Sequence, residues 1–169
     1  MRFFTLLILL LSSPLSLPSY ALEKPSHRVV LTVSGAINVT NVNQEAAFDM
    51  TMLQALPQYV VTTKNPWAKA AHTYQGFSAI DLLNSLGNKG NLLQVTALNK
   101  YMTEIPLSDF VEQGAIFATH QDGVPMSVRN LGPIMVIYPF DANENLRSEL
   151  YYSRSIWQVS SIKTLIVAE

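Results

Sequence analysis

The chain has 169 residues, with 11 Lys and Arg against 12 Asp and Glu, a formal net charge of -1, and no cysteine. Its 49% hydrophobic and 14% charged residues exclude a disordered chain, and the near-zero charge argues against a nucleic-acid-binding protein, which must neutralise phosphates. The absence of cysteine excludes a disulfide framework, a thiolate metal site and a cysteine nucleophile. The length accommodates one domain of ordinary size.

The first 21 residues have the pattern of a secretory signal peptide. Arg2 gives a positive start, Phe3 to Leu11 form an apolar run, and Ser19 and Ala21 are the small residues that a signal peptidase reads. A membrane anchor is the alternative, but this run is about half the roughly 20 residues that a spanning helix needs. We therefore expect cleavage after Ala21 and a soluble bacterial protein, periplasmic or secreted, with residues 22–169 as a single domain and no membrane span.

The first half of this mature chain alternates between strand and helix patterns. A strand is expected over Arg28–Ser34, followed by a helix over Gln44–Leu56 with Asn43 as its cap. The β-branched run Gln58–Thr63 predicts a second strand, after which Lys64–Trp67 should break it and a loop should carry His72. A capping box of Ser78 and Asp81 predicts a helix that ends at Gly87.

The second half contains more strands than helices. In chain order we expect a hairpin of Leu92–Leu98 and Tyr101–Ile105, a helix over Leu107–Gln113, strands over Ala115–His120 and Ile134–Tyr138, and a closing strand or strand pair within Trp157–Val167. The polar stretch Asp141–Leu150 should contain one helical turn, in a lid or in an ordinary loop. This mixture predicts a β-rich α+β fold.

No local motif identifies a known catalytic site. His27, His72 and His120 are far apart and have no ligand partner at helical spacing, so zinc catalysis has no support. The nucleophile elbow, the phosphate-binding P-loop and the dinucleotide-binding glycine motif are all absent.

Aromatic and hydrogen-bonding residues recur instead at expected loop positions. Such residues suit a cleft for a planar polar ligand, because rings supply contact area while Arg or Asn groups fix the ligand's orientation. The alternative is ordinary half-buried packing beside strands. The candidate cleft residues are Asn65, Trp67, His72, Tyr101, Arg129, Tyr152 and Arg154, with Arg129 and Arg154 as the anion contacts.

Five segments, in order from about residue 62 to 167, resemble the oxidoreductase molybdopterin-binding domain of the sulfite oxidase family. They are Tyr74–Leu83, Asn99–Tyr101 with Ile105 and Pro106, Asp122–Met126, Gly132 and Pro133 through Pro139, and Arg154–Trp157 with Ile162. The resemblance implies a β-rich α+β fold that, in full members, holds a molybdenum–pterin cofactor and carries out oxygen-atom chemistry in exported proteins.

The sequence departs from this family at the positions that would hold the cofactor. The resemblance places the family's metal-binding cysteine near Thr62 or Thr63, and a Thr hydroxyl does not ionise near neutral pH to give a soft anionic ligand. The family's Arg between two prolines falls at Met135, and a Lys near the end falls at Trp157. Both exchanges remove charge-assisted hydrogen bonds to a phosphate-bearing ligand.

We therefore expect a protein that has lost molybdenum redox chemistry, has no catalytic residues or metal site, and binds a small molecule or a protein partner in the ancestral cleft. No cofactor is expected, although the resemblance alone would allow molybdopterin. One alternative is an active molybdopterin enzyme with Thr62 or Thr63 as an oxygen ligand to the metal. Another is a periplasmic interaction or sensory module, in which Trp67 and the pair Tyr151 and Tyr152 contact a protein.

Overall fold

The computed structural model describes residues 22–168, so the predicted signal peptide lies outside the described part of the chain. Two five-stranded sheets form the framework. The strands of the first sheet, in spatial order, are β2 (Ala46–Phe48), β1 (Leu31–Gly35), β10 (Val159–Leu165), β5 (Leu92–Ala97) and β6 (Met102–Pro106). β1 and β10, the first and last strands of the described chain, pair in parallel in the middle of this sheet. The other strand pairs are antiparallel.

The second sheet is antiparallel. Its strands are β3 (Gln58–Asn65), β4 (Ala68–Phe77), β7 (Ile116–Gln121), β8 (Val124–Pro125) and β9 (Met135–Ile137). The β3–β4 hairpin pairs with one edge of β7, and β8 and β9 share the other edge.

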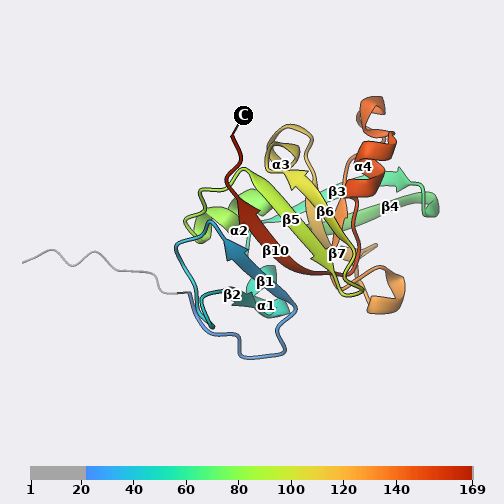
Figure 1. Ribbon diagram of the computed structural model, residues 1–169. Helices are drawn as coiled ribbons and strands as arrows, with labels where there is room; N and C mark the ends of the chain where they lie inside the picture. The colour runs from blue at the N-terminus through green and yellow to red at the C-terminus, as the bar shows by residue number, and fades with distance from the viewer. Residues whose placement is uncertain (1–21, 169) are drawn as a thin grey trace, which may run out of the picture.

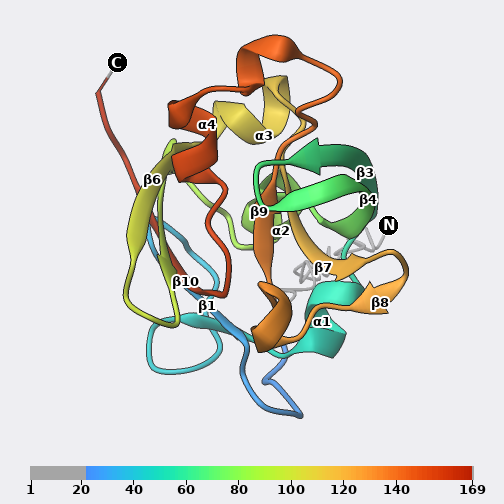
Figure 2. The ribbon, with the colours of Figure 1, turned by 90° about the vertical axis from the view of Figure 1, so that its right-hand side faces the viewer.

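Short helices connect the strands of these sheets. They are α1 (Met50–Gln54), α2 (Ala79–Ser85), α3 (Ser108–Glu112) and α4 (Glu149–Arg154), with 3₁₀-helices η1 (Val128–Asn130) and η2 (Glu144–Leu146). Figure 1 shows β1, β10, β5 and β6 across one face of the molecule. In Figure 2 this sheet lies at the left, β7, β9, β3 and β4 lie at the right, and α3 and α4 are together at one end. No helix within residues 22–168 is long and apolar enough to cross a bilayer.

The core forms because the strands alternate inward apolar and outward polar side chains. Leu93, Val95 and Ala97 of β5 are almost fully buried while the residues between them are half-buried, which is the period of a strand with one covered face. Phe117 lies at the centre, stacked on Phe77 at 5.5 Å and on Phe110 at 5.1 Å between ring centroids. The prediction of a β-rich α+β fold is confirmed.

The predicted helix over Gln44–Leu56 is wrong in its first half. Asn43 and Gln44 have positive φ angles of 46° and 64°, which a helix start does not allow, and Ala46–Phe48 form β2 against β1. The helix begins only at Met50, because the Asp49 carboxylate accepts the Met52 N–H as its cap. Sheet pairing with β1 therefore overrides the helix propensity of these residues.

The predicted break after Thr63 and the loop around His72 are also corrected. β3 continues to Asn65, the chain turns at Pro66 and Trp67, and His72 lies inside β4, paired with Thr63. The Ser78 cap is present, because its hydroxyl accepts the Ile80 N–H, but the Asp81 Oδ2 atom is buried without a hydrogen-bond partner. The reciprocal half of the expected capping box therefore does not form.

Candidate functional site

The turn of the β3–β4 hairpin is fixed by the side chain of Asn65. Its Oδ1 accepts the Trp67 N–H at 3.0 Å, and its Nδ2 donates to the Tyr74 hydroxyl at 2.7 Å. Tyr74 is only 2% exposed, and burial raises the pKa of its hydroxyl. A neutral, buried tyrosine thus anchors Asn65, and Asn65 in turn positions Trp67.

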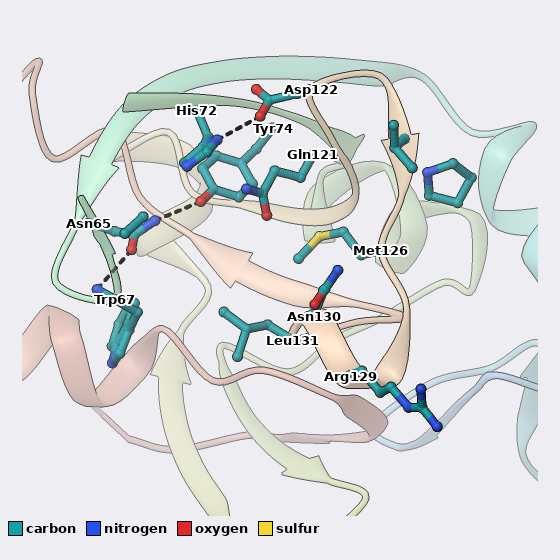
Figure 3. Close-up of a pocket in the computed structure, with 13 residues that line it drawn as sticks. Asn65, Trp67, His72, Tyr74, Gln121, Asp122, Met126, Arg129, Asn130 and Leu131 are labelled. Atoms are coloured by element: carbon teal, nitrogen blue, oxygen red, sulfur yellow. Dashed lines mark hydrogen bonds and ion pairs between the residues drawn. The ribbon is translucent and has the colours of Figure 1, made fainter. Parts of the chain in front are cut away.

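A cavity of about 700 Å³, the first cavity, opens beside this turn. The β3–β4 hairpin, the β7–β8 hairpin and η1 surround it, and Met126 and Leu131 supply apolar surface (Figure 3). Its polar residues are Asn65, His72, Tyr74, Gln121, Asp122, Arg129 and Asn130. A concave site in which polar groups can orient a ligand against apolar surface is the usual form of a small-ligand site.

His72 and Asp122 form the best-defined polar pair at this cavity. Asp122 and Gly123 both have positive φ angles, 49° and 77°, so the β7–β8 turn directs the carboxylate back onto β4. There Asp122 Oδ1 accepts the Thr73 N–H at 2.9 Å, and Asp122 Oδ2 lies 2.6 Å from His72 Nδ1.

These contacts set the direction of the hydrogen bond between the two side chains. The Thr73 N–H and then the His72 ring lower the pKa of Asp122, so its carboxylate stays ionised. An ionised carboxylate accepts only, and the Nδ1 atom of His72 must therefore carry the proton and donate. This leaves Nε2 as the ring atom that is available for a hydrogen bond with a ligand.

Arg129, on η1, is the cationic residue of the first cavity. It is exposed, and it takes part in no ion pair within residues 22–168. In Figure 3 its guanidinium points away from His72 and Tyr74 and from the other labelled residues of the lining. Arg129 is thus an exposed cation at the side of the cavity lining, and it does not contact the His72–Asp122 pair.

A second cavity, of about 280 Å³, lies on the other side of Trp67. Tyr101 and Tyr152 line it together with Trp157, and Trp67 faces both cavities. The Trp67 ring makes edge-to-face contacts with Trp157, at 5.3 Å between centroids, and with Tyr152, at 6.4 Å.

Arg154 lines neither cavity. Its Nη1 donates to Asp109 Oδ2 at 3.0 Å, and both side chains are largely buried, with 17% and 7% exposed. The Tyr138 hydroxyl donates to the same carboxylate oxygen at 2.6 Å, and burial together with this carboxylate raises the pKa of Tyr138. Arg154 therefore serves a buried structural network instead of facing a ligand.

The seven predicted residues thus occupy three places. Asn65, Trp67, His72 and Arg129 line the first cavity, Trp67, Tyr101 and Tyr152 line the second, and Arg154 lies apart. Sequence reasoning missed Asp122, Gln121 and Asn130. Asp122–Gly123 is a typical turn sequence, but the contact of Asp122 with His72, 50 residues earlier, has no local signature.

Two packed sheets with a cavity beside a hairpin turn define this chain as a mixed α+β domain. The model of the family described as "Oxidoreductase molybdopterin binding domain" matches residues 21–142, so the chain belongs to this family. The motif Arg154–Trp157, which also suggested the resemblance, lies beyond the matched residues.

A solved structure supports the same fold. The sulfane dehydrogenase SoxCD from Paracoccus pantotrophus superposes with a TM-score of 0.62 at 14% sequence identity, over 82% of this chain. The match spans 38% of the SoxCD chain, so this chain corresponds to well under half of it. No curated protein sequence matches the chain.

The residues present do not fit the family's molybdenum centre. Thr63, at the expected ligand position, is fully buried, and its hydroxyl accepts the Asp141 N–H at 3.1 Å and donates to the Lys64 carbonyl at 2.9 Å. Thr62 points to the opposite face of β3, toward the Thr73 hydroxyl at 3.1 Å. Met135 and Trp157 supply no cation, and residues 22–168 bring together no cluster of three or more His, Asp or Glu that could hold a metal ion.

Proposed function

We propose that this protein is an exported binding protein of the molybdopterin-binding oxidoreductase family that has lost molybdenum redox chemistry and binds a small polar molecule in the first cavity. The observation that carries the proposal is the state of Thr63. The chain contains no thiol, and the hydroxyl at the expected ligand position is enclosed by two backbone hydrogen bonds. The hydrogen of this hydroxyl is donated to the Lys64 carbonyl and one of its lone pairs accepts the Asp141 N–H, and no cationic side chain within residues 22–168 donates to it to favour its ionisation to an anionic metal ligand.

The first cavity supports a ligand that combines an anionic group with a hydrogen-bonding group. Arg129, without an ionic partner among the described residues, suits a carboxylate or another small anion at the side of this cavity. His72, held by Asp122, offers Nε2 to a donor inside the cavity. Met126 and Leu131 cover the apolar part of such a molecule.

The proposal is tested on protein isolated from the cell envelope of its own source and examined by native mass spectrometry. We expect a chain that begins at Leu22 and carries a small adduct without molybdenum. The His72→Ala/Arg129→Met double variant should lose this adduct, while Tyr59→Leu, an exposed residue on β3 outside the cavity, should keep it. The absence of any adduct, or an adduct retained in the double variant, would contradict the proposed site.

The alternative of an active enzyme with a threonine ligand makes a different prediction. Thr62→Ala and Thr63→Ala would then abolish an oxidoreductase activity present in the wild type. On our proposal neither wild type nor variant has such an activity, and Thr63→Ala alone lowers the free energy of unfolding, because the Asp141 N–H loses its buried acceptor.

A further inference from the structure

The second cavity has a composition that the proposed function does not use. It is bounded by the β3–β4 turn, the turn between β5 and β6, and the segment from α4 to β10. Four of its lining residues are aromatic: Trp67, Tyr101, Tyr152 and Trp157. The chain contains two tryptophans, and both are here.

The aromatic rings line different sides of the second cavity. The Trp67 plane lies at 72° to that of Trp157 and at 78° to that of Tyr152, so neighbouring rings are nearly perpendicular. Tyr101 approaches from the β5–β6 turn, where its hydroxyl donates to the Ser153 carbonyl of α4 at 3.5 Å. Tyr101 is 49% exposed and Trp67 is 39% exposed, so ring surface remains open to a ligand.

Contacts within the protein fix the segments that carry these aromatic residues. Asn65 fixes the Trp67 backbone, as described above, and Asn99 Oδ1 accepts the Tyr101 N–H at 2.9 Å. Trp157 forms a backbone bridge with Met135, which ties it to the second sheet. These contacts fix the backbone from which the rings project, and the edge-to-face contacts of Trp67 with Trp157 and Tyr152 restrict the rings themselves, which lowers the entropy lost when a ligand binds.

The electrostatic character of this cavity disfavours an anion. None of the residues found to line it, all within residues 22–168, is charged. The Ser153 and Ser155 hydroxyls donate to the carbonyls of Leu150 and Tyr151, so their hydrogens are directed away from the space. The nearby Arg154 is neutralised by Asp109. An anion would therefore lose its hydration without gaining a cation.

A methylated ammonium ion meets the opposite conditions. Its charge is spread over methyl groups, it is weakly hydrated, and aromatic faces attract it electrostatically. A cavity of about 280 Å³ is smaller than the usual range for drug-sized ligands, which favours a headgroup-sized ion. We propose that the second cavity is a binding site for a small quaternary ammonium cation.

The test measures binding of tetramethylammonium and choline by tryptophan fluorescence and by calorimetry, since both tryptophans line the site. The matched neutral probe is 3,3-dimethylbutan-1-ol, which has the shape of choline without its charge. We expect both cations to bind and the neutral alcohol to bind at least about tenfold more weakly. Equal binding of the alcohol, or no response to either cation in the millimolar range, would overturn the proposal.

Variants locate the binding and separate it from the first cavity. Tyr101→Leu and Tyr152→Leu should each weaken choline binding about tenfold, because each removes one ring. Tyr59→Leu is the matched control, since Tyr59 is similarly exposed, at 44%, and lies outside the cavity. The His72→Ala/Arg129→Met variant should bind choline as the wild type does. A loss there and not in Tyr101→Leu would place the cation in the first cavity and overturn the assignment.

Discussion

Arg129 and Arg154 carry the same side chain in opposite electrostatic surroundings. Arg129 is exposed at the first cavity, whereas Arg154 is largely buried against Asp109, which also accepts the Tyr138 hydroxyl. Removing one member of a buried ion pair leaves the other charge uncompensated, while an exposed arginine without a partner contributes little to stability.

This contrast predicts different stabilities for two matched variants. Arg154→Met should lower the free energy of unfolding by about 3 kcal/mol, and Arg129→Met should change it by no more than about 0.5 kcal/mol. Urea denaturation followed by circular dichroism measures both. Equal effects of the two substitutions would show that Arg154 does not have the structural role assigned to it.

Asp49 gives the protein a defined response to acid. Its carboxylate accepts the N–H groups of Met52, Ser26 and His27, and these bonds lower its pKa from 3.8 to about 2, with the Met52 bond as the largest cause. A folded-state pKa below the unfolded value means that the stabilisation is complete above about pH 4 and is lost as the pH falls toward 2.

Asp49→Asn should therefore be less stable than the wild type at neutral pH, because it removes the charge that these donors stabilise. The difference should shrink as the pH falls from about 4 to about 2, where the wild-type carboxylate also becomes neutral. Thermal unfolding at a series of pH values measures it. A difference that stays constant over this range would exclude the assigned role.

The β3–β4 hairpin positions both cavities, and its contact with β7 depends on Gly76. A Cβ atom there would overlap the Phe117 carbonyl oxygen and lie 2.7 Å from Ala118 Cα, so β4 and β7 would have to separate. Gly123, at the β7–β8 turn, differs: a Cβ atom would meet nothing within 4 Å, and only its φ of +77° opposes a side chain.

Gly76→Ala should accordingly destabilise the protein by about 3 kcal/mol or prevent folding, and Gly123→Ala should cost about 1 kcal/mol. Thermal unfolding of the two variants and of the wild type provides the comparison. The reverse order of stability would contradict the close approach of β4 to β7.

Elements with local signals were predictable from the sequence, and those defined by distant partners were not. The turn at Asn99 and Lys100 and the apolar run around Val136 predicted the β5–β6 hairpin and β9 correctly. Residues 46–48 have a helical pattern, and only the neighbouring β1 makes them a strand. The parallel pairing of β1 with β10 joins residues about 130 positions apart, beyond the reach of any local pattern.

The same limit applies to the candidate site. Aromatic and polar loop residues indicated a cleft, and four of the seven predicted residues line the first cavity. The sequence predicted one cleft, whereas the predicted residues line two cavities. Arg154 pairs with Asp109, 45 residues earlier, and no local pattern predicts such a tertiary contact.

At the scale of the whole molecule, the fold is that of a cofactor-binding family, but the residues at the expected cofactor positions do not suit the cofactor. The fold agrees with the molybdopterin-binding domain, while the sequence resemblance aligns the family's cofactor-binding residues with a buried Thr63 and with the uncharged Met135 and Trp157. A scaffold can keep its packing after its chemistry has changed, because the fold and the site depend on different residues.

The most direct test of this account is the molybdenum and pterin content of the protein after expression in a host that makes the cofactor and loads its own molybdenum enzymes. Elemental analysis for the metal and fluorescence of the oxidised pterin give both values per chain, with a molybdenum enzyme of the same host as the positive control. We predict that neither reaches a stoichiometric level in the folded, mature protein. One molybdenum and one pterin per chain would contradict the account.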